Sequence, residues 1–274
     1  MDFHYKHAII TGGSSGIGRA MARLLTKEGA HISIIARRQE LLDETVTELR
    51  GLAEDPAQRV MAHSADLTDW EQATGAITTL TANIPPDILI NNAGFAQPGY
   101  FEEIPLEIFQ KTMDIDYFGT VYATKAVVPM MMKRKSGRIV NVSSMAGFLG
   151  TFGYTPYAPA KFAVRGFTES LRQELKPHGI HVSIVFPPDT DTPQLHYENQ
   201  FKPPETKRIS GTIKPQSADQ VARAVIRGIE RGKTYITPGF DPWLYFVLFN
   251  GPIGLFHWYC DRLVAKTQRE RKVS

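Results

Sequence analysis

Cysteine is almost absent from this chain of 274 residues, in which Cys260 is the only one. A single cysteine builds neither an internal disulfide framework nor a cysteine-based metal site, and its scarcity is typical of a reducing compartment. The eight histidines form no HExxH or similar pair, so we predict no catalytic metal. The net charge of +3 is too small to indicate a nucleic-acid partner.

An N-terminal targeting segment is also lacking, because the apolar run at residues 7–11 leaves no room for a signal peptide before it. We therefore expect a cytoplasmic protein. Hydrophobic residues make up 42% of the chain and charged residues 22%. This balance is typical of a globular chain with one large domain and a sizeable core.

Short apolar runs alternate with helical segments along most of the chain. The expected strands are residues 7–11, 31–36, 59–65, 87–90, 138–143, 181–186 and 234–237. The expected helices are residues 16–28, 39–54, 106–133 and 157–176. The alternation predicts an α/β fold, a parallel sheet covered by helices on both faces, in one domain over residues 1–240. Residues 187–215 are rich in proline, threonine and charge, and we expect an irregular substrate loop there.

A glycine-rich turn follows the first expected strand and opens a helix. Glycine lets the backbone turn tightly and approach a ligand, and the helix N-terminus offers free N–H groups to a pyrophosphate. The spacing Gly-x3-Gly-x-Gly at this position therefore predicts a dinucleotide site. The residues assigned to it are Gly12, Ser14, Ser15, Gly16, Ile17 and Gly18.

Two arginines, Arg37 and Arg38, end the second expected strand. An acidic residue there would bind the ribose 2′-hydroxyl of NAD, whereas arginine suits a 2′-phosphate. We predict NADPH as the cofactor, with Arg37 as the main contact and with Ser14 and Arg38 assisting. The alternative is that both arginines are solvated loop charges.

Tyr157 and Lys161 lie four residues apart, which places both side chains on one face of a helix. An ammonium held beside a phenol favours the phenolate, so we expect Lys161 to lower the pKa of Tyr157. Such a tyrosine exchanges a proton with a carbonyl or alcohol oxygen near neutral pH. Ser144 ends an apolar strand and could present its hydroxyl to the same oxygen. Taken alone, the pair is also common by chance on helix surfaces.

These pieces occur in the order typical of the short-chain dehydrogenase/reductase family, which the chain resembles over about residues 5–240. The motifs are TGGSSGIG (11–18), Asp66, Asn91 to Gly94, Ser144 and Tyr157-x3-Lys161. The resemblance implies a Rossmann-type, doubly wound sheet of seven parallel strands. It also implies that Tyr157 is the general acid, that Ser144 orients the carbonyl and that Lys161 holds the nicotinamide ribose. The further cofactor contacts it implies are Asp66, Leu67, Asn92, Ala93 and Gly94.

One position departs from the family pattern. Asp116 stands where the family usually has an asparagine that relays protons to the lysine. A carboxylate there would stabilise the charge of Lys161 and weaken its effect on Tyr157, or it would carry protons itself. The alternative is a shifted helix in which Asp116 is a structural cap.

A narrower resemblance is to the 3-ketodihydrosphingosine reductases, carried by PPDTDTP (187–193) and by residues 147–171. It implies reduction of 3-ketosphinganine to sphinganine with NADPH. Pro187, Thr190 and Thr192 are then expected beside the cofactor. We also expect Asp189 and Asp191 to face the substrate amine, because a carboxylate attracts an ammonium. The alternative for all of these polar residues is ordinary turn chemistry.

The C-terminal extension, residues 241–274, is first apolar and then basic. Residues 242–260 contain no charged side chain, have aromatic residues at both ends and are broken by Asn250-Gly251-Pro252. This pattern favours a re-entrant hairpin or an interfacial helix pair that contacts the membrane surface. Five later cations, from Arg262 to Lys272, suit an anionic lipid surface. The alternative is a dimer interface or a flap over the site.

Three functions remain open at this stage. The first is the reduction of a long-chain keto-lipid, 3-ketosphinganine. The second is another reductase on the same scaffold, for a steroid, a retinoid or a 3-oxoacyl group, because the pocket sets the substrate. The third is a regulatory protein that binds NADPH without turnover. The family resemblance further implies a homo-oligomer, a dimer or a tetramer.

Overall fold

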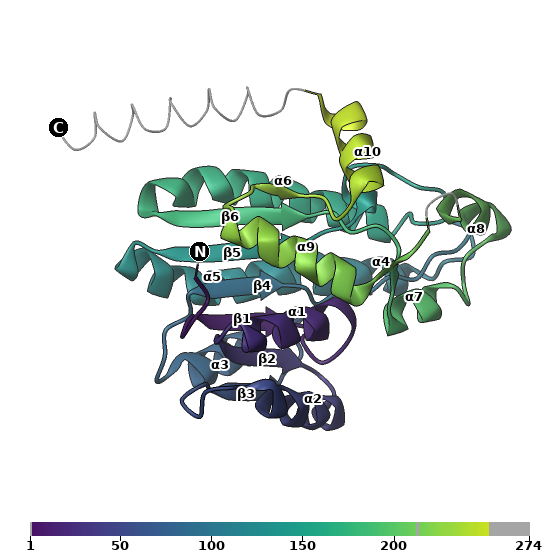
Figure 1. Ribbon diagram of the computed structural model, residues 1–274. Coiled ribbons are helices and arrows are strands. Elements are labelled where there is room, and N and C mark those ends of the chain that lie inside the picture. The colour runs from purple at the N-terminus through teal and green to yellow at the C-terminus, as the bar shows by residue number, and fades with distance from the viewer. Residues whose placement is uncertain (1, 212–213, 252–274) are drawn as a thin grey trace.

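The computed structural model describes residues 2–211 and 214–251, and its centre is a parallel sheet of seven strands. The strand order is β3-β2-β1-β4-β5-β6-β9 (Figure 1). The strands are β1 His7–Thr11, β2 His31–Ala36, β3 Val60–Ser64, β4 Ile88–Asn91, β5 Gly137–Val142, β6 Ile180–Val185 and β9 Tyr235–Ile236. The order reverses between β1 and β4, so the carboxyl ends of these two strands flank the crevice in which such folds bind ligands.

Helices cover both faces of the sheet, as the alternating pattern predicts. On one face lie α1 Gly16–Lys27, α2 Gln39–Leu52 and α9 Ala218–Glu230. On the other lie α3 Trp70–Thr81, α5 Gly119–Arg134 and α6 Tyr157–Leu175. The fold class expected from the sequence, a doubly wound parallel α/β sheet of the Rossmann type, is therefore confirmed.

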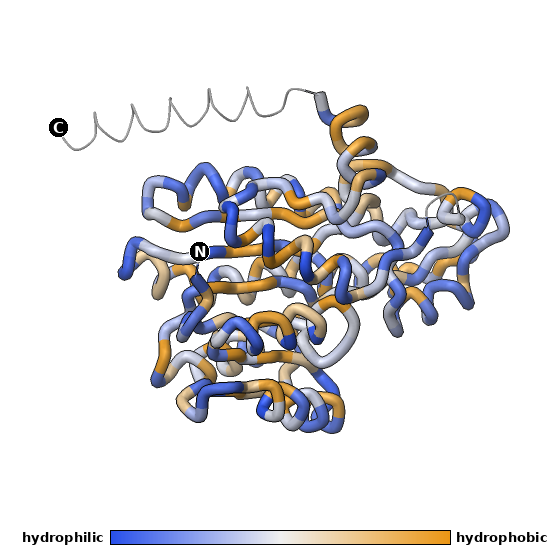
Figure 2. Tube along the Cα trace, in the orientation of Figure 1, coloured by the Kyte–Doolittle hydropathy of each residue, from blue (hydrophilic) through white to orange (hydrophobic). Residues whose placement is uncertain are grey.

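The central strands are buried along almost their whole length because both of their faces are covered. All five residues of β1 are buried, and Ala8 pairs with Ile32 of β2 on one side and with Ile88 of β4 on the other. This explains why the strand runs read as continuous apolar stretches rather than as alternating ones. Figure 2 shows the same pattern as hydrophobic tube segments through the middle of the molecule.

The long helical region expected at residues 106–133 is interrupted. It consists of α4 Leu106–Met113, a π-helical turn at Asp114–Phe118 and α5. Such wide turns are rare and occur mostly at functional sites. The strand and helix bounds elsewhere agree with the expected ranges to within about two residues, as helix and strand ends usually do.

Two helices, α3 and α9, were missed by the sequence analysis, although each begins with a recognisable cap. Asp69 accepts a hydrogen bond from the backbone N–H of Gln72 at the start of α3. Ser217 and Gln220 form a complete capping box at the start of α9. The capping side chains accept hydrogen bonds from free N–H groups at a helix start. Their sequence patterns could have located both helices.

The prediction of an irregular substrate loop at residues 187–215 is wrong in part, because this segment contains regular secondary structure. Within it lie β7 Thr190–Asp191, α7 Pro193–Glu198 and α8 Pro204–Ser210. β7 pairs with β8 Gln216–Ser217 in a small separate sheet. Proline at the first helical position starts both α7 and α8, where its missing N–H costs nothing.

The C-terminal extension begins with α10 Phe240–Asn250, which stands beside α6 at the edge of the molecule (Figure 1). The helix ends at Asn250, as the Asn-Gly-Pro sequence predicts, and Gly251 has a φ of 51°. No helix among the described residues is long and apolar enough to cross a membrane. The rest of the expected apolar segment and the basic residues after it lie outside the described residues.

Candidate active site

The loops that follow the carboxyl ends of the central strands surround a cavity of about 400 Å³. Thirteen of the residues predicted from the sequence line it: Gly12, Ser15, Gly16, Ile17, Asn92, Ala93, Gly94, Ser144, Tyr157, Lys161, Pro187, Thr190 and Thr192. They come from loops spread over most of the chain, and the parallel sheet gathers them because all of its strands end at the same edge. The volume is within the range of small-molecule sites.

The glycine-rich turn forms one wall of the cavity, between β1 and α1. Gly12 has a φ of 64°, which residues with a side chain rarely adopt. A Cβ on Gly18 would lie 2.4 Å from the backbone oxygen of Gly12, so only glycine permits this close packing. Ser15 caps α1 without a side-chain hydrogen bond, which leaves N–H donors of the helix start free for an anion.

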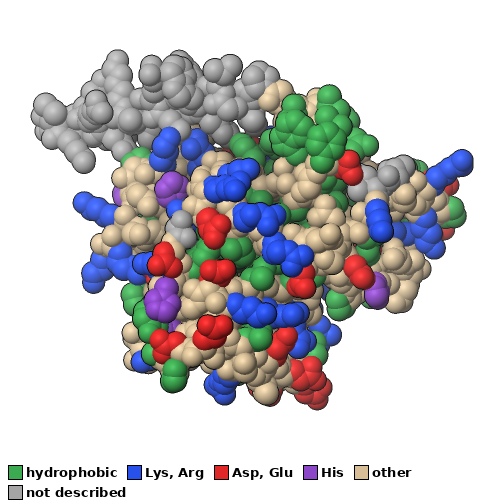
Figure 3. All heavy atoms as spheres, in the orientation of Figure 1, with side chains coloured by type: hydrophobic (Ala, Val, Ile, Leu, Met, Phe, Trp, Pro, Cys, Tyr) green, Lys and Arg blue, Asp and Glu red, His purple; other side chains and the backbone are tan. Residues whose placement is uncertain are grey.

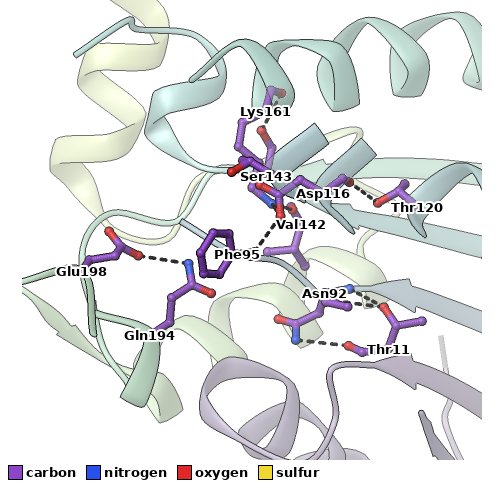
Figure 4. Close-up of polar contacts among 12 residues, drawn as sticks. Thr11, Asn92, Phe95, Asp116, Thr120, Val142, Ser143, Lys161, Gln194 and Glu198 are labelled. Atoms are coloured by element: carbon purple, nitrogen blue, oxygen red, sulfur yellow. Dashed lines mark hydrogen bonds and ion pairs between the residues drawn. The ribbon is translucent and has the colours of Figure 1, made fainter. Parts of the chain in front are cut away.

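Asn92, after β4, holds this turn in place (Figure 4). Its side-chain amide donates to the backbone oxygens of Thr11 at 3.2 Å and Gly12 at 3.3 Å. Its own N–H donates to the Thr11 hydroxyl at 2.9 Å. Ala93 and Gly94 continue from it along the cavity wall. The turn is thus tied to the neighbouring strand and presented in one conformation.

Tyr157 and Lys161 occupy the first two turns of α6 and face the cavity. The Lys161 ammonium lies 5.4 Å from the centre of the Tyr157 ring and donates to the backbone oxygen of Val142 at 3.2 Å. Only 4% of Lys161 is exposed. Ser144 lies at the end of β5, where its hydroxyl accepts a hydrogen bond from the N–H of Ala146. Phenol, hydroxyl and ammonium therefore meet at one end of the cavity.

The expected lowering of the Tyr157 pKa is wrong for the protein alone. Burial raises the pKa of Tyr157 well above its ordinary value, and the negative charges of Asp116 and Glu198 act in the same direction. A hydrogen bond with the Ser144 side chain opposes them. The Lys161 ammonium is shared with an acidic partner, Asp116, which offsets its effect on the phenol. The phenol is therefore neutral, the state in which it can donate a proton.

Asp116 lies fully buried in the π-helical turn, beneath the cavity (Figure 4). Its Oδ1 accepts a hydrogen bond from the N–H of Phe95 at 2.8 Å and lies 3.7 Å from the Lys161 ammonium. Its Oδ2 is buried without a hydrogen-bond partner among the described residues. Burial raises the pKa of Asp116 to about 6, although the charge of Lys161 lowers it. The residue thus reaches the lysine, as a relay member must, and it also braces the loop after β4.

Seven predicted residues lie outside the cavity lining: Ser14, Gly18, Arg37, Arg38, Asp66, Leu67 and Asp116. The two arginines are exposed at the end of β2, and neither has an acidic partner within residues 2–211 and 214–251. Asp66 accepts hydrogen bonds from the N–H and the hydroxyl of Thr68 and so shapes the turn after β3. Leu67 is buried in the core.

The polar residues of the PPDTDTP segment form turns and caps. Thr190 donates to the Pro188 oxygen at 2.8 Å, and Thr192 caps α7 by accepting from the N–H of Leu195. Asp189 lies at the cavity wall but is paired with Lys202 at 3.0 Å. The expectation for Asp191 is wrong, because its side chain is 70% exposed and pairs with His196 away from the cavity.

Sequence reasoning missed a second polar group in the cavity. Tyr154 and Glu198 both line it, and the tyrosine hydroxyl donates to the glutamate at 2.8 Å. Gln194 donates to the other oxygen of Glu198 at 3.0 Å (Figure 4). The burial of Glu198 follows from the packing of α7, and no local motif in the sequence indicates it.

A family model described as short chain dehydrogenase matches residues 6–203. The chain belongs to the short-chain dehydrogenase family. Within it, the chain is 42% identical over 238 residues to the 3-dehydrosphinganine reductase of Danio rerio, covering 86% of this chain and 71% of that one. It is 40% identical over 282 residues to the 3-ketodihydrosphingosine reductase of Dictyostelium discoideum, covering 95% and 82%.

Solved structures agree with this placement. A short-chain dehydrogenase from Sphingobium yanoikuyae in complex with NADPH superposes with a TM-score of 0.78. The two chains are 28% identical, and the match covers 92% of this chain and 94% of the other. The resemblance to the short-chain dehydrogenases, and within them to the 3-ketodihydrosphingosine reductases, is confirmed.

Proposed function

We propose that the protein is an NADPH-dependent ketoreductase that converts 3-ketosphinganine to sphinganine in sphingolipid synthesis. The observation that carries the proposal is the meeting of Ser144, Tyr157 and Lys161 at one end of a cavity whose wall is the glycine-rich turn. Relatives with 40% and 42% identity over most of the chain bear the names of reductases for this ketone. Because the match to the Dictyostelium relative covers 95% of this chain, it includes residues 187–198, which line part of the cavity.

The residues present fit a dinucleotide phosphate. The free donors at the start of α1 suit a pyrophosphate, and glycine at positions 12 and 18 lets the turn pack closely against Ala93 and onto itself. Arg37 and Arg38 pair with no acidic side chain in the described part of the chain and suit a 2′-phosphate. Bound NADPH would supply the hydride. We assign Asp66, Asn92, Lys161 and Thr192 to its remaining contacts.

Tyr157 has the central chemical role in this proposal. Its neutral phenol donates a proton to the oxygen of the ketone as negative charge develops there, which makes it the general acid. Ser144 holds the same oxygen by a hydrogen bond. The Lys161 ammonium stabilises the phenolate that remains, at low cost because its own position is already held by Val142 and Asp116. Asp116 is proposed to position Lys161 and to pass protons to it.

The apolar helix α10 is proposed to place the enzyme on the cytosolic face of a membrane. Its inner side packs on the domain, since Phe246 contacts Phe148 and Phe186 and Tyr245 lines the cavity. Its outer side exposes five large apolar residues, Phe240, Trp243, Val247, Leu248 and Phe249. These make the hydrophobic area visible over α10 in Figure 3. A long-chain ketone leaving the bilayer would reach the cavity along this helix.

A homo-oligomer, a dimer or a tetramer, is also proposed. This proposal rests on the family alone. The exposed outer side of α10 would be covered either by a second copy of the chain or by a lipid surface. Light scattering of the purified full chain in detergent, compared with the chain ending at Gly239, measures the subunit number and whether α10 contributes to it.

A panel of ketones with NADPH tests the proposed activity. We expect 3-ketosphinganine to be reduced with a kcat/KM at least tenfold above those of a steroid ketone and a 3-oxoacyl thioester. Tyr157→Phe removes the proton donor, so its kcat should fall by about 10²-fold or more while its NADPH affinity changes little. A steroid or thioester preferred over 3-ketosphinganine, or a Tyr157→Phe variant with the wild-type rate, contradicts the proposal. NADPH binding without turnover of any ketone would instead indicate a regulatory protein.

A further inference from the structure

Glu198 is a carboxylic acid set into the cavity wall, and no lysine or arginine among the described residues lies within ion-pair distance of it. The residue is only 7% exposed, and α7 carries it to the lining of the cavity. Its hydrogen bonds come from two neutral donors, the Tyr154 hydroxyl at 2.8 Å and the Gln194 amide at 3.0 Å. It forms no ion pair with any lysine or arginine in the described parts of the chain. Burial raises the pKa of Glu198, while its two hydrogen bonds and the charge of Lys202 lower it. A positively charged group bound in the cavity would favour the ionised carboxylate and pair with it.

The other charges around the cavity are already paired. Asp189 lies 3.0 Å from Lys202, whose side chain is 2% exposed. Asp116 lies 3.7 Å from Lys161. Two ammonium groups thus face three carboxylates, and Glu198 is the carboxylate left over. One additional ammonium in the cavity would bring this cluster to neutrality.

The distance from Glu198 to the reacting centre is short. Tyr154 bridges the two, because its hydroxyl binds Glu198 while its ring centre lies 5.7 Å from that of Tyr157. The charge of Glu198 also acts on the phenol directly, raising the pKa of Tyr157. A ketone whose oxygen is held by Tyr157 would therefore react within range of the Glu198 carboxylate.

We propose that Glu198, oriented by Tyr154 and Gln194, binds the ammonium group on the carbon next to the ketone and thereby selects 2-amino ketones. The proposal rests on the proposed function and names the residue that distinguishes its substrate from other long-chain ketones. Glu198 thereby replaces Asp189 and Asp191 as the expected amine contact. Asp189 is already paired with Lys202, and Asp191 faces solvent.

Charge-assisted hydrogen bonds explain why this contact would favour ketones with the amine over ketones without it. An ammonium offers donors to a carboxylate that is already fixed in direction by two neutral donors, so little ordering is needed on binding. A ketone without the amine leaves the carboxylate buried and unbalanced, which weakens its binding. The same logic makes a site built for a polar group reject an analogue that lacks it.

The test compares 3-ketosphinganine with 1-hydroxyoctadecan-3-one, which has the same chain and ketone but no amine. The measured quantity is the ratio of the two kcat/KM values, for the wild type and for Glu198→Gln. Glutamine keeps the shape and removes the charge, so we expect the ratio to fall about tenfold or more. Asp191→Asn is the matched control on the same segment and should keep the wild-type ratio. NADPH affinity and Tm of each variant verify that the fold and the cofactor site are intact.

The outcomes separate this inference from the proposed function. A wild-type ratio near one means that the enzyme does not recognise the amine, which overturns the substrate assignment and this inference together. A high wild-type ratio that Glu198→Gln retains overturns the inference alone and leaves the proposed reaction standing. If Glu198→Gln lowers the ratio by lowering kcat/KM for the amino ketone, and Asp191→Asn keeps the wild-type ratio, the result supports both the inference and the proposed function.

Discussion

At the scale of the single residue, Asp116 determines how charge is distributed beneath the site. It holds the N–H of Phe95 and approaches the Lys161 ammonium with the same oxygen, Oδ1. A carboxylate here neutralises part of the lysine charge, where the family asparagine would not. Burial raises the pKa of Tyr157 in the protein alone, and the negative charge of Asp116 adds to this effect.

Relative to the wild type, Asp116→Asn should be more stable at pH 7 than at pH 4. Burial raises the folded-state pKa of Asp116 from 3.8 to about 6, so the folded state keeps a proton that the unfolded state loses first. The stability from this group is therefore present below pH 4 and lost as the pH rises through 6. Asparagine has no proton to lose, and the difference in unfolding free energy should grow by about 3 kcal/mol across this window.

Urea unfolding at pH 4, 5, 6 and 7 measures this difference. Asp114→Asn is the control, because Asp114 lies in the same turn but outside the core and hydrogen-bonds Gln110. Its difference from the wild type should stay flat over the series. An Asp116→Asn difference that is equally flat means that the buried carboxyl does not change its charge in this range.

The sequence was sufficient to place Tyr157, Lys161 and the glycine-rich turn at the site, because each depends on spacing within one turn or one helix. The same reasoning could not find Glu198 or its partner Tyr154, which are 44 residues apart and meet only through tertiary packing. It also assigned the substrate amine to Asp191, whose exposure no local pattern shows.

At the scale of the element, α10 carries apolar residues that face both inward and outward. The inner ones extend an aromatic cluster with Phe148, Phe186 and Tyr235. The outer ones, including Leu248 at 67% and Phe249 at 55% exposed, have no packing partner in the domain core. Exposed apolar groups of this number mark a contact surface.

Leu248→Asp combined with Phe249→Asp should weaken binding to lipid vesicles. Each exposed side chain would bury apolar area in the interface, and a charge in its place opposes insertion, so we expect about a tenfold or greater loss of affinity. Co-sedimentation with phosphatidylcholine–phosphatidylserine vesicles gives the affinity. Leu106→Asp is the matched control, because Leu106 is 80% exposed on α4 and is expected to leave binding unchanged.

Two further results would speak against membrane contact. One is equal vesicle binding by the double variant and the wild type. The other is the same subcellular fraction for the full chain and for a chain ending at Gly239. A loss of the homo-oligomer in the double variant, with vesicle binding unaffected, would assign α10 to a subunit interface.

At the scale of the whole molecule, the parallel sheet brings distant loops to one edge. The glycine-rich turn after β1, the arginines after β2, Asn92 after β4 and Ser144 after β5 all follow carboxyl ends of strands. Their order along this edge is the order of the strands, β2-β1-β4-β5. A dinucleotide bound across the switch point between β1 and β4 would therefore extend from the arginines toward Ser144 and Tyr157.

Cofactor binding should stabilise the whole domain, and Arg37→Asp should change which cofactor does so. A ligand at 100 times its Kd stabilises the folded state by about 2.7 kcal/mol, which raises Tm by several degrees. We expect NADPH to raise the wild-type Tm more than NADH at equal concentration, and Arg37→Asp to reverse this order. Lys125→Asp, an exposed cation on α5, should keep the wild-type order. Equal NADPH shifts in Arg37→Asp and the wild type would show that Arg37 does not bind the 2′-phosphate.

The sequence by itself determined the α/β class, the strand positions, the glycine-rich turn and the pairing of Tyr157 with Lys161. These features depend on neighbours in the chain, on a period of apolar residues or on a spacing of four. Only the tertiary structure decided that Lys161 shares its charge with Asp116, that Asp189 is already paired with Lys202 and that Glu198 is not. The physical reason is that burial and charge balance are properties of surroundings assembled from distant segments, and a side chain has no such surroundings until the chain has folded.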